Sequence, residues 1–120
     1  MIPNDALVNS ADILARTSVF SGSTGQRDDT WGTVVASGVP CRRDKLEYSR
    51  YVSGTEDALK VSDILLFNVS STIQFLVKEN HIKIGTEEFR IVRCNPLYSE
   101  KDYAGIAQID HYEVEVLLIV

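Results

Sequence analysis

The residue types that most often perform catalysis occur in this chain, but they are dispersed. His81 and His111 each lie beside apolar residues in strand-like runs, so both are expected at surface positions on strands. Three pairs of carboxylates are close in sequence: Asp28 with Asp29, Glu87 with Glu88, and Glu113 with Glu115. General acid–base catalysis needs carboxylates at a defined separation in a pocket, whereas neighbouring acids on turns and outward faces usually serve solvation. These residues indicate no catalytic centre.

Motifs that bind phosphate, metal or a cofactor are also missing. The chain has no nucleophile elbow, no HExxH pair and no dinucleotide fingerprint. The segment Gly22–Gly25 lacks the Lys and Ser/Thr that follow in a phosphate-binding loop, so it is interpreted as a turn. Cys41 and Cys94 are far apart and belong to no Cys/His cluster, so we expect reduced thiols that act as small apolar residues. The prediction is a protein that is not an enzyme and has no metal or other cofactor.

Length and charge narrow the class further. The 120 residues are enough for one domain that buries its own core. A net charge of −5 disfavours a protein that grips nucleic acid through clustered Lys and Arg, but it leaves proximity to DNA open. The apolar runs are too short to span a membrane, and Met1–Asp5 lack the features of a signal peptide. We therefore expect synthesis in the cytosol and no membrane contact.

Alternating apolar residues and turn clusters predict a β protein. After an N-terminal arm over residues 1–10, a strand is expected up to Phe20, followed by a polar loop over residues 26–30. A second strand opens at Trp31, and Gly38 with Pro40 inside it predicts a bend or a bulge. About six such strands, with no long helix and no internal repeat, indicate an all-β antiparallel barrel or sandwich.

The middle of the chain contains one ambiguous run and one clear hairpin. Val61–Phe67 fits either a strand or a short helix, whereas Ile73–Val77 alternates like a strand. Ile82 and Ile84 precede Gly85–Glu88, and apolar residues follow it. Because cross-strand partners share a face only when the loop has an even length, the connection is either Gly85–Thr86 as a type II′ turn or all four residues.

Residues 44–60 have no sustained period, mix charges of both signs and contain two tyrosines. Long loops in small domains are usually functional or disordered. This segment is therefore expected to be a long inter-strand loop, either a working element or a solvated insertion.

The end of the chain, Tyr112–Val120, is apolar on both faces. Two explanations remain open: burial against a neighbouring copy, with Leu117, Ile119 and Val120 as the subunit interface, or a central strand buried inside one domain.

The order of these features resembles the head-tail joining proteins of tailed bacteriophages, the small head-completion or stopper family. The likeness rests on the early strand Asp12–Thr17, an acidic turn followed by Trp31, the block Lys78–Val92 with its Gly-containing hairpin, and a closing strand Ile109–Val120. The chain departs from the family pattern at Asn80, where an acidic residue is common, and in the apolar stretch Ile64–Phe67.

The resemblance implies a small β-barrel that forms a six- or twelve-fold ring in the virion neck, assembled in the bacterial host cytoplasm. The portal or an adaptor protein would lie above the ring and a tail terminator or tail tube protein below it, with double-stranded DNA passing through. In the stopper family one long loop closes the channel after packaging. By position that loop is residues 44–60, with Tyr48, Arg50 and Tyr51 as lumenal residues.

Two alternatives are retained. The chain is also compatible with an adaptor, or with a tail terminator or tail completion protein of the same connector. From a different class, an OB-like barrel that binds single-stranded nucleic acid needs stacking aromatics beside a basic groove. Tyr48 and Tyr51 with Arg42, Arg43 and Arg50 are the candidates for that surface.

Overall fold

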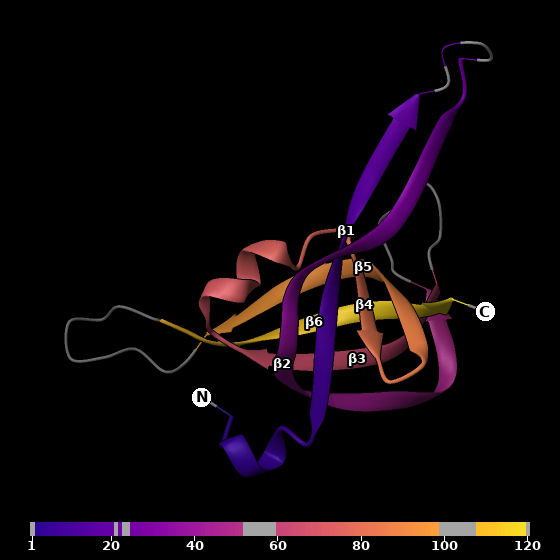
Figure 1. Cartoon of the computed structure of the whole chain (residues 1–120). Helices are drawn as coiled ribbons and strands as arrows, with labels where there is room; N and C mark the ends of the chain where they lie inside the picture. The colour runs from indigo at the N-terminus through magenta and orange to yellow at the C-terminus, as the bar shows by residue number, and fades with distance from the viewer. Residues whose placement is uncertain (1, 21, 23–24, 52–59, 99–107, 120) are drawn as a thin grey trace.

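Six antiparallel strands close into a barrel in the computed structural model, which describes residues 2–20, 22, 25–51, 60–98 and 108–119 (Figure 1). The strands are β1 (Asn9–Phe20), β2 (Arg27–Tyr51), β3 (Lys60–Asn68), β4 (His81–Ile84), β5 (Glu87–Tyr98) and β6 (Ile109–Ile119), and their order around the barrel is β1-β2-β3-β6-β5-β4. Two short 3₁₀ helices are η1 (Asn4–Ala6) and η2 (Ser71–Phe75). The predicted all-β antiparallel barrel of about six strands is confirmed.

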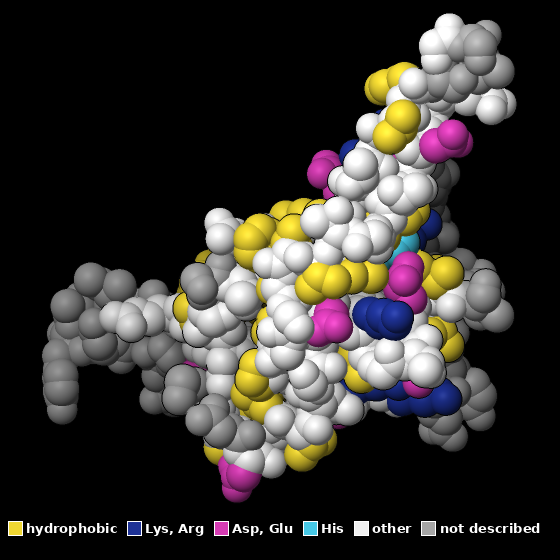
Figure 2. All heavy atoms as spheres, viewed as in Figure 1, with side chains coloured by type: hydrophobic (Ala, Val, Ile, Leu, Met, Phe, Trp, Pro, Cys, Tyr) yellow, Lys and Arg dark blue, Asp and Glu magenta, His cyan; other side chains and the backbone are white. Residues whose placement is uncertain are grey.

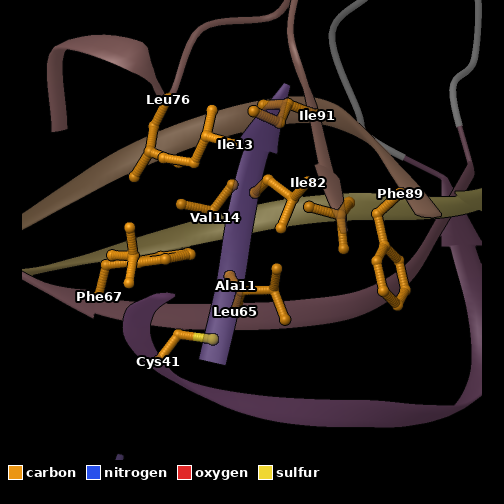
Figure 3. Packing of buried hydrophobic residues seen from close by; sticks show 12 residues of the cluster. Ala11, Ile13, Cys41, Leu65, Phe67, Leu76, Ile82, Phe89, Ile91 and Val114 are labelled. Atoms are coloured by element: carbon orange, nitrogen blue, oxygen red, sulfur yellow. The ribbon is translucent and has the colours of Figure 1, made fainter. Parts of the chain in front are cut away.

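The barrel interior is filled by apolar side chains from every strand (Figure 3). Phe67 of β3 and Phe89 of β5 are the largest side chains that are fully buried. Alternate residues of each strand point inward, as the period of a β-strand requires. Each buried side chain of this size contributes roughly 1.5–3 kcal/mol relative to an exposed one, so this core is the main source of stability.

Strand β2 is long because it serves two neighbours in turn. Residues up to Cys41 pair with β1, and pairing with β3 begins at Arg42. Gly38 has φ +65°, and the Oδ1 atom of Asp12 accepts hydrogen bonds from the Gly38 amide (3.0 Å) and the Ser37 hydroxyl (3.2 Å). The expected irregularity at Gly38 is therefore confirmed as a β-bulge at which two residues of β2 oppose Asp12 alone.

The distal half of the β1–β2 hairpin leaves the barrel and projects from it (Figure 1). We call residues 17–20 and 27–30 the arm. They pair one to one, from Thr17 opposite Thr30 to Phe20 opposite Arg27, while β1 contacts β4 only through Asp12–Leu14. The prediction of a polar loop over residues 26–30 is wrong for Arg27–Thr30. A two-stranded ribbon outside the core has no face that must be apolar, so the usual alternation is absent.

The predicted strand at Ile73–Val77 is also wrong, because this segment contains η2. The Ser70 hydroxyl accepts a hydrogen bond from the Thr72 amide at the start of η2. Residues three apart lie on one side of a 3₁₀ helix, and accordingly Ile73 and Leu76 both pack against the core. The apolar residues of Ile73–Val77, which alternate as in a strand, thus pack against the core from a helical turn.

The β4–β5 hairpin has the shorter of the two expected connections. Ile84 pairs with Glu87 and Ile82 with Phe89, which leaves Gly85 and Thr86 as the turn. Gly85 has φ +62° and Thr86 has a negative φ, as a type II′ turn requires. Because residues of β5 alternate between the two faces, Glu87 and Phe89 face inward while Glu88 and Arg90 face outward.

The prediction of a long loop over residues 44–60 is wrong for Asp44–Tyr51 and for Lys60. Asp44–Tyr51 belong to β2 and Lys60 begins β3, with a register irregularity between Lys45 and Arg50. Residues 52–59 lie outside the described part. The sequence did not predict a strand at Asp44–Tyr51, because this segment mixes charges of both signs and has no repeating apolar face.

The N-terminal segment predicted to precede the first strand, residues 1–10, is also too long by two residues, since Asn9 and Ser10 start β1. Its beginning is attached to the barrel: the Ile2 amide donates to Asn68 Oδ1 and the Asn68 side-chain amide donates to the Ile2 carbonyl, both at 2.8 Å.

The C-terminal strand β6 is a central strand, paired with β3 on one side and β5 on the other. Leu118 packs on the main core, and Leu117 packs on a second cluster with Val61 and Val92. The apolar residues on both faces of this strand are thus largely accounted for within the chain. Ile119 remains 42% exposed, and Val120 is outside the described residues.

Candidate functional site

A cavity of about 240 Å³ lies where the arm joins the barrel. Its position follows from the third register shift between β1 and β2, a bulge at which Trp31 and Gly32 of β2 together oppose the single residue Arg16 of β1. A bulge re-aims the side chains beside it. The cavity is lined by Arg16, Trp31, Lys78, Glu79, His81 and Arg90, and we call these six residues the basic pocket.

Trp31 and His81 form the aromatic part of the basic pocket. Their rings stack with centroids 3.9 Å apart and planes 7° apart. The Trp31 indole Nε1 donates to the carbonyl of Glu79 at 2.9 Å, and His81 Nδ1 is 2.8 Å from Glu88 Oε2. His81 is only 7% exposed. The prediction of a surface histidine is wrong, because its outward-facing strand position is covered by the indole.

Arg16 and Arg90 of the basic pocket differ from the other arginines whose side chains are described, because neither pairs with a carboxylate of the described residues. The ion pairs of the other arginines whose side chains the structure describes are Arg27–Asp29, Arg42–Asp44, Arg43–Asp63, Arg43–Glu87 and Arg93–Glu115. Within the described residues, Arg16 and Arg90 form no ion pair, and both line the basic pocket. Two guanidinium groups, with Lys78 beside them, are therefore available to an anionic group from outside.

A second charged cluster lies on the inner side of the sheet. Arg43 Nε donates to Asp63 Oδ2 at 2.6 Å, and its two terminal nitrogens donate to the two carboxylate oxygens of Glu87 at 2.8 and 3.1 Å. The guanidinium also lies over the Phe89 ring, 4.9 Å from the centroid. The hydrogen bonds from Arg43 lower the pKa of Glu87, and the same bonds raise the pKa of Arg43. We call these four residues the Arg43 cluster.

The sequence-predicted channel residues lie on or next to this part of β2. Tyr48, Arg50 and Tyr51 are in the strand, but their side chains lie outside the described part. Arg42 and Arg43, considered for a nucleic-acid surface, are both held by carboxylates.

Glu115 and His111, two further polar candidates, each have a partner within the chain. Glu115, expected to be solvated, is instead 4% exposed and accepts a hydrogen bond from Arg93 at 2.8 Å. His111 Nδ1 is 2.7 Å from Asp110. Among the residues that the structure describes, no group of three or more His, Cys, Asp or Glu side chains is placed to hold a metal.

Sequence reasoning missed the basic pocket because its members come from four separate segments. The available signal was Gly32 directly after Trp31, since a glycine inside a strand often marks a bulge.

No protein-family model matches the chain, and neither does any curated protein. No helix of the described residues is long and apolar enough to cross a membrane.

Proposed function

We propose that this protein is a structural component of a bacteriophage neck, where it forms a homo-oligomeric ring that joins head to tail around the DNA channel. The resemblance of the sequence to head-completion proteins suggests this role. The closed six-stranded barrel is compatible with it, because a small rigid subunit suits a ring.

The observation that carries the proposal is the arm. Val19 is 59% exposed and Phe20 is 71% exposed. Figure 2 shows hydrophobic side chains on the surface of the projecting arm. Beyond Leu14, β1 pairs only with β2, so the arm also has strand edges without a partner in the described chain. Apolar side chains and open edges on a projecting element are the usual material of protein–protein contacts.

The distribution of charge supports passage of DNA rather than its capture. The chain has a net charge of −5, and most of its described arginines are neutralised by carboxylates. A channel wall with few free cations would hold DNA only weakly, because strong attraction requires the release of many counterions. Closure of the channel by a free loop over residues 44–60, with Tyr48, Arg50 and Tyr51 at the lumen, is not part of the proposal, because Asp44–Tyr51 belong to β2 and Lys60 begins β3.

The direct test is to locate the protein in the native particle by electron cryomicroscopy. A ring between the portal and the tail is expected, with the adaptor, stopper or terminator position read from its neighbours. Particles made without the protein should lose packaged DNA or fail to join tails. Normal retention of DNA and normal tail joining in such particles would refute the proposal.

No observation favours the single-stranded nucleic-acid alternative through Arg42 and Arg43, since both are engaged in ion pairs. A salt-dependent gel shift that Arg42→Ala abolishes would reinstate it.

A further inference from the structure

We propose that the basic pocket receives the Asp28 carboxylate from the arm of a second copy of this chain, so that copies join arm to pocket. This inference rests on the proposed ring and names the contact that would build it.

The basic pocket is suited to a carboxylate. Arg16 and Arg90 have no ion-pair partner in the described chain, and arginine binds carboxylates through two parallel hydrogen bonds. Glu79 is part of the lining and Glu88 contacts His81 from behind. These two acids reduce the positive potential, which favours a singly charged carboxylate over a polyanion such as nucleic acid.

The arm presents a matching group. Asp28 pairs with Val19, and residues directly opposite each other in an antiparallel ribbon lie on the same face. Asp28 is exposed and forms no ion pair among the described residues, whereas the neighbouring Asp29 is held by Arg27 and Ser18 on the opposite face. One face of the arm therefore offers an apolar side chain beside a free acid. The basic pocket offers an aromatic ring beside free guanidinium groups.

The contact must form between copies. Asp28 is three residues from Trp31, about 10 Å along an extended strand, and the paired ribbon carries Asp28 away from the basic pocket of its own chain (Figure 1). When each arm docks on the next copy without a reciprocal exchange, the interface is heterologous and closes into a ring or continues as a filament. A ring of three or more copies requires an interface of this kind.

Charge reversal on each side tests the contact. We would measure self-association by sedimentation velocity up to about 1 mM, with the full chain and five variants. Asp28→Lys and Arg90→Glu are each expected to weaken association by about tenfold or more. The chain that carries both changes should regain most of the lost affinity, because the reversed charges again complement each other. The matched controls, Asp5→Lys and Lys45→Glu, change the charge equally at exposed positions outside both surfaces and should leave association unchanged.

Trp31 gives a second, local readout because it is the only tryptophan of the chain. Its emission should change as the copies associate, and the change should be absent in Asp28→Lys. The inference is overturned if the full chain does not associate at about 1 mM, if the double variant is no better than the single ones, or if the controls weaken association as much.

A further measurement adds a DNA oligonucleotide at low and high salt. Trp31 emission that responds to DNA and loses this response in Arg90→Glu, but not in Asp28→Lys, would assign the pocket to phosphate and overturn the proposed contact. This result is separate from the particle test: a ring in the neck that still forms with Arg90→Glu refutes the arm-to-pocket contact alone, whereas a protein absent from the neck refutes the proposed function.

Discussion

The Arg43 cluster and the basic pocket lie on opposite faces of the same hairpin and use their charges differently. Glu87 and Phe89 of β5 face inward to Arg43, while Glu88 and Arg90 face outward beside His81. Both sites combine arginine with an aromatic ring. In the Arg43 cluster the guanidinium is bound by two carboxylates, whereas Arg16 and Arg90 in the basic pocket form no ion pair with any residue that the structure describes.

This difference separates a charge that maintains the fold from charges available for a contact. Asp63 is 1% exposed, and a buried carboxylate without its cation is strongly unfavourable. Arg90 is exposed, so its removal leaves no buried charge uncompensated. Stability measurements on the two sites should therefore diverge.

The largest expected effect is on Arg43. Arg43→Met should lower the free energy of unfolding by about 3–5 kcal/mol, because the buried Asp63 carboxylate loses the guanidinium with which it pairs. The matched change Arg90→Met should alter it by no more than about 0.5 kcal/mol. Urea unfolding of both variants provides the measurement. Equal losses would show that the two sites do not differ in this way.

The next largest effect concerns the β4–β5 turn, which fixes which residues of β5 face inward and which face outward. Gly85→Ala places a side chain at φ +62°, which costs roughly 1–2 kcal/mol in the left-handed region. Because nothing lies within 4 Å of the added methyl, the loss would come from the backbone and not from a clash. Thr86→Ala is the control, and unfolding measurements that rank it as the more harmful change would contradict the turn assignment.

A smaller effect is expected for Trp31→Ala, about 1 kcal/mol for the lost ring stack. The more specific readout is His81, whose ring resonances should shift strongly by NMR when the indole no longer covers it. Trp31→Phe retains a ring but loses the hydrogen bond to the Glu79 carbonyl, so it should give a partial shift. His81 resonances that stay in place in Trp31→Ala would show that the two rings do not stack in solution.

The smallest effect is a pH dependence in the Arg43 cluster. The pKa of Glu87 is lower in the folded protein than its ordinary value of 4.5, so the stability it contributes is complete above that value and is lost as the pH falls through the folded pKa. The difference in unfolding free energy between the unmodified chain and Glu87→Gln should therefore shrink as the solution is acidified below 4.5. In an Arg43→Met background this pH-dependent difference should disappear. A difference that persists there would assign it to another group.

The parts of the fold that sequence predicted are those where local chemistry decides the backbone. Gly85 predicted a tight turn, Gly38 predicted a bulge, and the alternation of residues in β6 predicted a strand. Arg27–Thr30 and Ile73–Val77 were assigned incorrectly because their structures depend on position in the fold: the first pairs outside the core, where no apolar face is needed, and the second packs across the core as a helical turn.

The site was harder to predict for a similar reason. His81 is adjacent to Trp31 only because the bulge opposite Arg16 turns the indole over β4. Whether an arginine is free depends on distant partners, as Arg43 shows by reaching Asp63 and Glu87. From the sequence alone, an arginine that pairs with carboxylates cannot be distinguished from one that does not.

The burial of the two cysteines has a practical consequence. Cys41 is fully buried and half-buried Cys94 packs against the core. Burial raises the pKa of the Cys41 thiol to about 11 and also raises the pKa of Cys94. Because the thiolate is the reactive form, neither should label readily near neutral pH. A cysteine introduced at Val19 would then carry a fluorophore or spin label selectively, and distances between labels could be measured directly in assembled particles.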